Sequence, residues 1–368
     1  MAEKKVDTPA ARYGKVILFL FLIVFKALRV PPRVFRRERI RNIMEFWSIP
    51  MMWLFVTSGG KRIYCDMPCT FKMPADVKTK CEVAPEYRFT KAQMEQFYRD
   101  GFIGPLTAVS EEEMREIRDE LVAEMSSESK AFGFKTVRDR HLDSPLMLSL
   151  FTRPVFTERL AQLLGPDLLI WRSQFFNQEP GAPPIHWHQA SAYMVENYER
   201  PVLEPVEKND LFQLTTWLAV DDAKLDNGCM QFARGTHDQI RTITLGGDPT
   251  FFGARYQMDF EPKPEQIVTM ELKAGQFVIF SERCVHGSPG NRSNRRRLGL
   301  NFRTILPSTR VYRGQESYYA VTLKDTWKLD KWGVYVLRGE DKYHVNKVFA
   351  GHPASTTAQK PTTDAVGA

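Results

Sequence analysis

The chain has 368 residues, of which 43% are hydrophobic, so it can form a packed core and is not a wholly disordered protein. Its formal net charge is +7, but residues 1–62 alone hold 13 Lys and Arg against four acidic residues, which leaves the remaining chain near −2. Because that remainder lacks the basic face that nucleic-acid binding requires, no nucleic-acid partner is expected.

Two apolar runs, Val16–Phe25 and Phe46–Val56, interrupt the basic N-terminal region. Each has about half of the ~20 residues that a helix needs to span a bilayer. No small-X-small cleavage site follows the first run, so a removed signal peptide is not expected. We therefore predict that residues 1–86 form a retained membrane-associating region that lies in, or loops into, one leaflet.

This prediction assigns membrane contacts to two kinds of residue. Trp47 and Trp53 would lie at headgroup depth, and the arginines of residues 33–41 would face anionic lipid. The protein would then be membrane-associated, with its catalytic domain facing the cytoplasm. The alternative is a buried helical hairpin that covers the catalytic domain, and a true span is disfavoured by Lys26 and Arg29.

The five cysteines are odd in number and irregularly spaced. Cys65, Cys69 and Cys81 could supply part of a zinc site, but no fourth ligand with the usual spacing accompanies them. Isolated reduced thiols are therefore expected at these positions and at Cys229 and Cys284, which suits a reducing compartment.

The middle of the chain has the pattern of a soluble enzyme, and we expect a catalytic domain over 87–350. Thr90–Gly101 predicts a capped amphipathic helix that ends at its glycine. Ser110–Met125 predicts a second helix, opened by a capping box between its first residue and Glu113. Residues 351–368 are polar and rich in Thr and Ala, which predicts a disordered tail.

Short apolar or alternating runs, bounded by Gly, Pro and Asn, follow from Asp167 onward. Such runs predict the strands of a β-sandwich or barrel. The clearest are LLIWRSQFFNQ, FQLTTWLAV, IVTMEL, GQFVIF and RRLGLNFRTI. The catalytic domain is therefore expected to be mainly β with flanking helices.

Three of the seven histidines lie where a metal site could form. His186 and His188 follow a proline-rich turn, and on a strand they would share one face with Ala190. His286 comes shortly after the buried run GQFVIF. An oxygen-activating mononuclear iron site usually has two histidines and one carboxylate, and here the carboxylate position carries a methyl group. The histidines expected to be bystanders are His141, His344 and His352.

Residues 90–345 resemble the phytanoyl-CoA dioxygenase family of Fe(II)/2-oxoglutarate oxygenases. The resemblance rests on several motifs in the same order: FYRDGFI, DRHLDSPL, the segment PPIHWHQ, TTWLAVDDAKLDNGCMQFARGTH and AGQFVIFSERCVHGS. It implies a double-stranded β-helix (jelly roll, cupin-like) that binds Fe(II) through His188 and His286. It also implies that Arg297 binds the distal carboxylate of 2-oxoglutarate, which its forked guanidinium suits.

Ala190 departs from the family pattern, because the family's hydroxylases have Asp there. In this respect the segment HQA is similar to the His-X-Ala branch of non-haem iron halogenases. That resemblance implies that chloride takes the vacated position and that O2 and 2-oxoglutarate drive radical chlorination of an unactivated C–H bond. It also implies that Arg303 lies near the halide, whereas Thr215 and Trp217 would be pocket wall or core packing.

Three other interpretations remain open at this stage. The chain could be an inactive member that has lost its metal, or His186 could complete a three-histidine site. A hydroxylase could instead fill the vacancy with water or with a remote carboxylate, from Asp221, Asp222 or Glu196.

The substrate is expected to be lipid-like or another hydrophobic metabolite, because the apolar N-terminus would hold the enzyme at a membrane surface. Acyl groups tethered to a carrier protein are the alternative, since the HQA segment resembles enzymes that act on them. The near-neutral catalytic domain offers no clear docking patch for an acidic carrier, which favours the lipid-like substrate.

Overall fold

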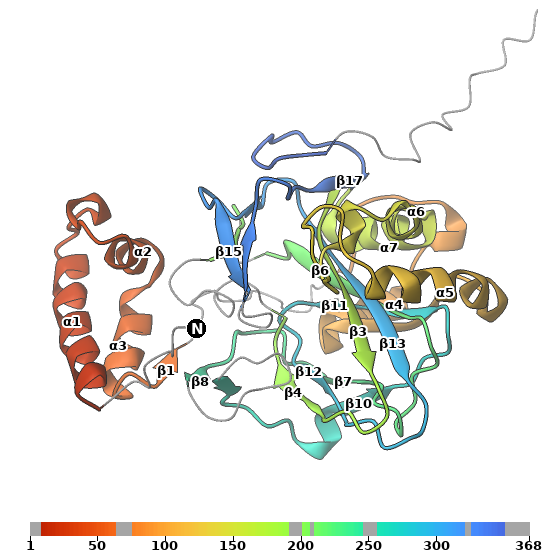
Figure 1. Cartoon of the computed structure of the whole chain (residues 1–368), viewed down its shortest axis with the longest axis horizontal. Coiled ribbons are helices and arrows are strands. Elements are labelled where there is room, and N and C mark those ends of the chain that lie inside the picture. The colour runs from red at the N-terminus through yellow and green to blue at the C-terminus, as the bar shows by residue number, and fades with distance from the viewer. Residues whose placement is uncertain are drawn as a thin grey trace, which may run out of the picture.

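Two antiparallel β-sheets form the centre of the molecule (Figure 1). The computed structural model describes residues 9–63, 76–190, 201–206, 210–245, 256–320 and 325–349. The larger sheet has the strand order β17-β3-β13-β6-β11-β2, and the smaller has the order β10-β7-β12-β4. Every pair of neighbouring strands in both sheets is antiparallel, as a jelly-roll fold requires.

The five clearest runs predicted from the sequence all form strands, and further strands join them in both sheets. The larger sheet consists of β2 (Phe102–Thr107), β3 (Leu168–Gln178), β6 (Gln213–Ala219), β11 (Gln276–Ser281), β13 (Arg297–Ile305) and β17 (Tyr335–Arg338). The smaller sheet consists of β4 (Ile185–His188), β7 (Met230–Ala233), β10 (Ile267–Met270) and β12 (His286–Ser288). Short ribbons add β1 (Arg62–Ile63), β8 (Ile243–Leu245), β9 (Tyr256–Met258), β5 (Leu203–Glu204), β14 (Arg310–Val311), β15 (Ser317–Ala320) and β16 (Asp325–Lys328).

One group of helices covers the outer face of the larger sheet, and a second group forms a separate N-terminal unit (Figure 1). Those on the sheet are α4 (Lys91–Asp100), α5 (Glu111–Ser126), α6 (Pro145–Phe151) and α7 (Pro154–Leu164). The N-terminal unit contains α1 (Pro9–Ala27), α2 (Glu38–Phe46) and α3 (Ile49–Thr57). Single 3-10 turns occupy Pro32–Val34, Pro85–Tyr87, Arg140–Leu142 and Pro264–Gln266.

The helix ends follow the predicted capping residues. Thr90 caps α4 in a complete capping box with Gln93, and Gly101 ends that helix in the left-handed region at φ 87°. Ser110 caps α5 by accepting a hydrogen bond from the Glu113 amide. The Glu113 carboxylate pairs with an arginine of α7's N-cap instead of returning to Ser110, so only half of the predicted capping box forms.

Alternation along β13 separates a hydrophobic outer face from a polar inner face. Leu300 and Phe302 belong to the cluster beneath the helices α4–α7. Arg297, Asn301 and Arg303 have the opposite parity and lie on the side of the smaller sheet. The strand therefore carries charged side chains into the space between the two sheets.

The N-terminal helices pack on one another, and this overturns one predicted membrane contact. Trp47 is 4% exposed, with its ring centroid 5.2 Å from Phe19 and 5.9 Å from Phe55. The prediction that Trp47 lies at headgroup depth is wrong, because its ring fills the interior of the helical unit. Trp53 is 52% exposed. Among the described helices, none is both long and apolar enough to cross a bilayer.

The helical unit is joined to the catalytic domain by a short ribbon and a shared apolar cluster. Ile63 of β1 pairs with Ile243 of β8, and Arg62 forms an ion pair of 2.6 Å with Asp259. The same cluster extends from the helices to Trp171 of β3. The domain division at residue 86 stays a prediction, and the predicted tail 351–368 lies outside the described residues.

Candidate iron and 2-oxoglutarate site

Two histidines face each other across neighbouring strands of the smaller sheet. His188 ends β4 and His286 begins β12, and the two residues are paired in the antiparallel register. Their ring centroids lie 4.2 Å apart, with an interplanar angle of 52°. Gly287 allows this close approach, because a Cβ there would lie 2.8 Å from the carbonyl oxygen of Ile185.

Each ring is fixed by a hydrogen bond to its own strand. The Nδ1 atom of His188 lies 2.8 Å from the carbonyl oxygen of His186, and that of His286 lies 2.9 Å from the carbonyl oxygen of Cys284. Because a carbonyl oxygen can only accept, Nδ1 carries the proton in both rings and Nε2 keeps its lone pair. This is the arrangement in which histidine binds a metal ion.

Both imidazoles are held in the neutral form. Burial and, to a smaller extent, the positive charge of Arg303 lower the pKa of His188 to about 4, although the hydrogen bond to His186 opposes them. Burial also lowers the pKa of His286 well below its usual value, with His188 and Arg303 as further causes. The pair can therefore donate lone pairs at neutral pH without first losing a proton.

A β-bulge separates His186 from this pair. His188 pairs with His286 but Ile185 pairs with Ser288, so β4 has one residue more than β12 over this stretch. The extra residue breaks the alternation that would have placed His186 and His188 on one face. His186 is exposed to solvent, and no described group of three His, Cys, Asp or Glu side chains could hold a metal ion.

Ala190, two residues beyond β4, is 8% exposed and belongs to the apolar cluster between the sheets. That cluster also contains Phe232 and Phe280, which contact the ring of His286 at centroid distances of 6.1 and 4.8 Å. Position 190 therefore faces the same interior as the histidines and offers no oxygen atom to a metal.

Gln189 fixes the turn between His188 and Ala190. Its Nε2 donates to the carbonyl oxygens of Gln239 and Arg283, and its Oε1 accepts from the amide of Arg241. Three hydrogen bonds to two loops fix the backbone on both sides of this glutamine. Gln189 carries no pattern in the sequence that would have indicated this role, because its partners are distant along the chain.

Arg297 is fully buried at the start of β13. Its guanidinium donates to the carbonyl oxygens of Gly228 and Phe176 and to the side chains of Gln178 and Ser288. These four partners are neutral, and burial lowers the pKa of Arg297 to about 10. Arg297 still keeps its proton at neutral pH. A buried cation whose partners are all neutral favours an anionic ligand.

Unpaired polar atoms lie on the inner face of β6 and β13. Trp217 adjoins this arginine, whereas Thr215 lies opposite Arg303. Thr215 Oγ1, Trp217 Nε1 and Asn301 Oδ1 are buried and have no hydrogen-bond partner among the described residues. Trp217 lies over Gly299, where a Cβ would meet its ring, and the Arg297 Cζ is 5.4 Å from the same ring centroid. Buried polar atoms normally have partners, so these three indicate a ligand site. Alternation along β13 could have identified Asn301 from the sequence.

Arg303 lies on the same face, opposite Thr215 in the register. It is half-buried, and its Cζ is 5.9 Å from the ring centroid of Trp171. Its charge lowers the pKa of both His188 and His286, which places it within electrostatic reach of the pair.

The phytanoyl-CoA dioxygenase (PhyH) family model matches residues 97–299, which is more than half of the chain. The chain belongs to the phytanoyl-CoA dioxygenase family. The matched range begins within α4 and ends within β13, so it includes both histidines, Ala190 and Arg297.

Solved structures of iron-dependent enzymes share this fold. CytC3 with Fe(II) and alpha-ketoglutarate is 25% identical, with a TM-score of 0.58 over 72% of this chain and 93% of that chain. The non-heme monooxygenase ThoJ is 22% identical, with a TM-score of 0.51 over 67% and 84% of the two chains. EctD from S. alaskensis with bound Fe is 17% identical, with a TM-score of 0.50 over 72% and 92%. The last two show the fold alone.

Family membership and the likeness to CytC3 make this chain an iron- and 2-oxoglutarate-dependent oxidoreductase. The residues fit both groups. Two neutral imidazoles present Nε2 atoms for Fe(II), and a buried arginine with only neutral partners suits a carboxylate of 2-oxoglutarate. The unpaired atoms of the inner face supply further polar contacts.

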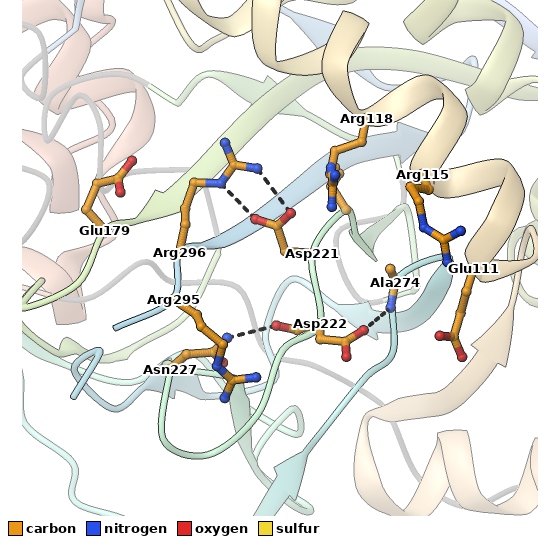
Figure 2. Close-up of a pocket in the computed structure, with 11 residues that line it drawn as sticks. Glu111, Arg115, Arg118, Glu179, Asp221, Asp222, Asn227, Ala274, Arg295 and Arg296 are labelled. Atoms are coloured by element: carbon orange, nitrogen blue, oxygen red, sulfur yellow. Dashed lines mark hydrogen bonds and ion pairs between the residues drawn. The ribbon is translucent and has the colours of Figure 1, made fainter. Parts of the chain in front are cut away.

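Two of the three remote carboxylates considered for the vacancy, those of Asp221 and Asp222, have partners elsewhere. The Asp221 carboxylate pairs with Arg296 at 2.8 Å, and the Asp222 carboxylate accepts from the Ala274 amide at 2.9 Å. Figure 2 shows both at a polar pocket of about 610 Å³ next to α5. Glu196 lies outside the described residues.

The remaining sequence predictions for cysteine and histidine have mixed outcomes. Cys81, Cys229 and Cys284 are free thiols, as expected, whereas Cys65 and Cys69 lie outside the described residues. Of the three histidines expected to be bystanders, His344 is exposed, His141 is buried and His352 lies outside the described residues.

His141 is a structural histidine whose protonation should oppose folding. It lies beneath the sheet with its Nδ1 2.9 Å from Ser173 Oγ, and burial followed by the charge of Arg172 lowers its pKa to about 3. The unfolded value is about 6.5. Because the unfolded chain binds the proton more readily, the contribution of His141 is fully present above that value and is lost as the pH falls toward 3.

We expect the difference in unfolding free energy between pH 7.5 and pH 4.5 to be about 2 kcal/mol smaller in His141→Gln than in the wild type. Urea titration of both proteins at both pH values measures it. The other buried histidines are common to both proteins, so they cancel in the comparison. Equal pH differences would show that His141 does not resist protonation in the folded state.

Proposed function

We propose that this protein is an Fe(II)/2-oxoglutarate-dependent radical halogenase that chlorinates unactivated aliphatic C–H bonds. The observation that carries the proposal is position 190, where a buried alanine stands in place of the family's carboxylate beside two neutral, oriented histidines. A site that had decayed would be expected to lose several of its residues together, whereas His188, His286 and Arg297 are all retained in one interior.

Each residue has a distinct task in this proposal. His188 and His286 would hold Fe(II) through Nε2, and their hydrogen bonds to backbone carbonyls keep the rings oriented. Arg297 would bind the distal carboxylate of 2-oxoglutarate, and Thr215 and Trp217 would line the cosubstrate pocket. When bound, Fe(II) and 2-oxoglutarate would activate O2, which is the oxidant for cleavage of the C–H bond.

A halide is favoured at position 190 by space and by charge. The methyl side chain of Ala190 leaves the room that a carboxylate would fill, and its neighbours in the cluster are apolar. Replacing a carboxylate ligand by chloride keeps one negative charge at the metal. Arg303, whose charge reaches both histidines, would stabilise an anion that has left water.

The overall reaction balances with these cosubstrates. One C–H bond and one C–C bond of 2-oxoglutarate break, and one C–Cl bond forms. Substrate, chloride, O2, 2-oxoglutarate and one proton give the chlorinated product, succinate, CO2 and water. O2 is the oxidant, and 2-oxoglutarate provides the remaining two electrons.

We propose a lipid-like substrate, with carrier-tethered acyl groups as the alternative. The support is the apolar N-terminal unit, whose cluster of buried side chains continues to Trp171 in the catalytic domain. Arg303 lies within cation–π distance of that tryptophan, so the apolar cluster approaches the site.

Product analysis tests the proposal. Anaerobic addition of Fe(II) and 2-oxoglutarate should give a visible charge-transfer band, which chloride should perturb. Lipid extracts from cells with the enzyme should contain species with the chlorine isotope pattern, which bromide shifts to brominated species. Hydroxylated lipids regardless of halide would replace the halogenase by a hydroxylase, and absence of the band would indicate an inactive member.

A further inference from the structure

We infer that the free side of α1 is a docking surface for a bilayer with anionic headgroups. Figure 1 shows α1 at the outer edge of the molecule, on the side away from the catalytic domain. Large apolar side chains project from this side: Tyr13, Ile17, Leu20, Phe21, Val24 and Leu28, with exposed fractions of 71, 55, 41, 59, 54 and 69%. We call these six residues the α1 stripe.

The α1 stripe has the spacing of one helical face. Its members recur at intervals of three and four residues, so they lie along one side of the helix. Phe19 and Leu22 lie on the opposite side, where they are buried against the other helices of the unit. The stripe is therefore not the exposed edge of a core that α2 and α3 already cover.

No charged side chain interrupts the α1 stripe. The exposed residues from Tyr13 to Leu28 are all uncharged, and Lys15 and Lys26 are half-buried. Lys26 donates to the carbonyl oxygen of Met44, and burial lowers its pKa despite the nearby Glu45. An uncharged helix face that exposes six large apolar side chains is unusual on a soluble protein and indicates a binding site.

α3 also exposes apolar side chains, one of them an aromatic residue suited to an interface. Trp53 is 52% exposed and Ile49 is 38% exposed. An indole carries an apolar ring and one polar N–H, which places tryptophan at headgroup depth in membranes. Of the two tryptophans predicted at headgroup depth, Trp47 is excluded because it lies inside the helical unit. Trp53 lies outside the unit, so its membrane contact stays a prediction.

Basic residues adjoin the C-terminal end of α1. Arg29 ends the helix at φ 56°, and the segment that follows carries Arg33, Arg36, Arg37 and Arg39 at exposed positions. Glu38 is the one exposed acidic residue between Arg29 and Arg39. This basic segment therefore forms a strongly positive rim beside the α1 stripe. A bilayer with an apolar interior and negative headgroups complements both parts, whereas a second copy of the chain would bring a like-charged rim.

The docking surface fixes how the catalytic domain would face the membrane. α1 is about 28 Å long at 1.5 Å per residue and would lie in the plane of the interface, because its inner side is packed on α3. β1 leads from the helices to β8, β8 pairs with β9, and β9 contacts β4, which carries His188. Because α1 lies on the side away from the catalytic domain, the rest of the helical unit would lie between the membrane and that domain. The docking does not rest on the proposed function.

Vesicle sedimentation of the full chain tests the docking surface without any turnover. With EDTA present, the wild type should bind vesicles of 70% phosphatidylcholine and 30% phosphatidylglycerol. Phe21→Asp with Val24→Asp should weaken binding at least about 100-fold, because two apolar side chains leave the interface and two anions enter it. Arg33→Gln, Arg36→Gln and Arg37→Gln together should weaken it about 100-fold on these vesicles and far less on pure phosphatidylcholine.

A matched control uses exposed apolar residues of the catalytic domain. Leu225 and Tyr343 are 50% and 57% exposed, so Leu225→Asp with Tyr343→Asp adds the same charge at the same exposure. This variant should bind vesicles as the wild type does. Equal binding by the α1 variant and the wild type would overturn the proposal. So would a wild-type dimer in light scattering that ignores vesicles and dissociates in the α1 variant.

Discussion

Ala190→Asp should convert the enzyme from a halogenase to a hydroxylase. The new carboxylate would occupy the position that the proposal gives to chloride, so the metal keeps its charge and loses its halide. We expect chlorinated product to disappear and hydroxylated product to replace it, while consumption of 2-oxoglutarate continues. Mass spectrometry of products, with succinate measured in parallel, gives both readouts.

Stability measurements provide a second readout of the same substitution. Position 190 is buried among apolar side chains, so an aspartate without a metal should lower the unfolding free energy by about 2–3 kcal/mol. Fe(II) should restore that stability, because it binds the folded state. Ala190→Gly is the matched control, since it keeps the space and adds no ligand, and it should retain chlorination. Continued chlorination by Ala190→Asp would contradict the assigned role of this position.

The strands were predictable because their hydrophobic pattern is local. β3 coincides with the run LLIWRSQFFNQ, and β13 with the last nine residues of RRLGLNFRTI. β3 begins with the apolar run LLIW, and β13 alternates between apolar and polar side chains, so each carries a local pattern typical of a strand. The pairing order, which places β13 between β3 and β6, depends on contacts between distant segments. The resemblance to a jelly-roll family implied the fold class but no strand order.

The candidate site was predictable in its members and less so in its geometry. Alternation along β13 placed Arg297 and Arg303 on one face, as the structure has them. The same rule failed on β4, because a bulge turned His186 to solvent. A bulge depends on register with the neighbouring strand, and nothing within β4 itself specifies it. Gln189 was likewise missed, since its partners lie on loops far along the chain.

The N-terminal unit shows how tertiary packing divides one apolar run into two roles. Composition alone assigned Trp47 and Trp53 to the same membrane interface. In the structure α1 packs on α3, which encloses Trp47 and leaves Trp53 outside. Hydrophobicity predicts that a segment leaves water. Whether its side chains enter a protein core or face lipid depends on which side of each helix packs against a neighbouring helix.

Arg297→Ala should abolish recognition of 2-oxoglutarate while leaving the metal site in place. Truncating one partner of a buried, hydrogen-bonded charge pair costs about 2–5 kcal/mol, which corresponds to at least a ~30-fold loss of affinity. Calorimetric titration of the Fe(II)-loaded protein with 2-oxoglutarate measures this loss. Arg297→Lys should recover only part of it, because a lysine cannot make the forked pair of hydrogen bonds.

Two comparisons separate ligand binding by Arg297 from a purely structural role. Wild-type protein with 2-oxoglutarate at about 100 times its Kd should gain about 2.7 kcal/mol of unfolding free energy, and Arg297→Ala, whose affinity is at least ~30-fold lower, should gain less than about 1 kcal/mol at that concentration. Arg296→Ala is the matched control. Arg296 precedes Arg297 and pairs with Asp221 at the surface pocket of Figure 2, so its loss should leave this gain unchanged. If both variants kept the full gain, the buried guanidinium would not be the group that binds the cosubstrate.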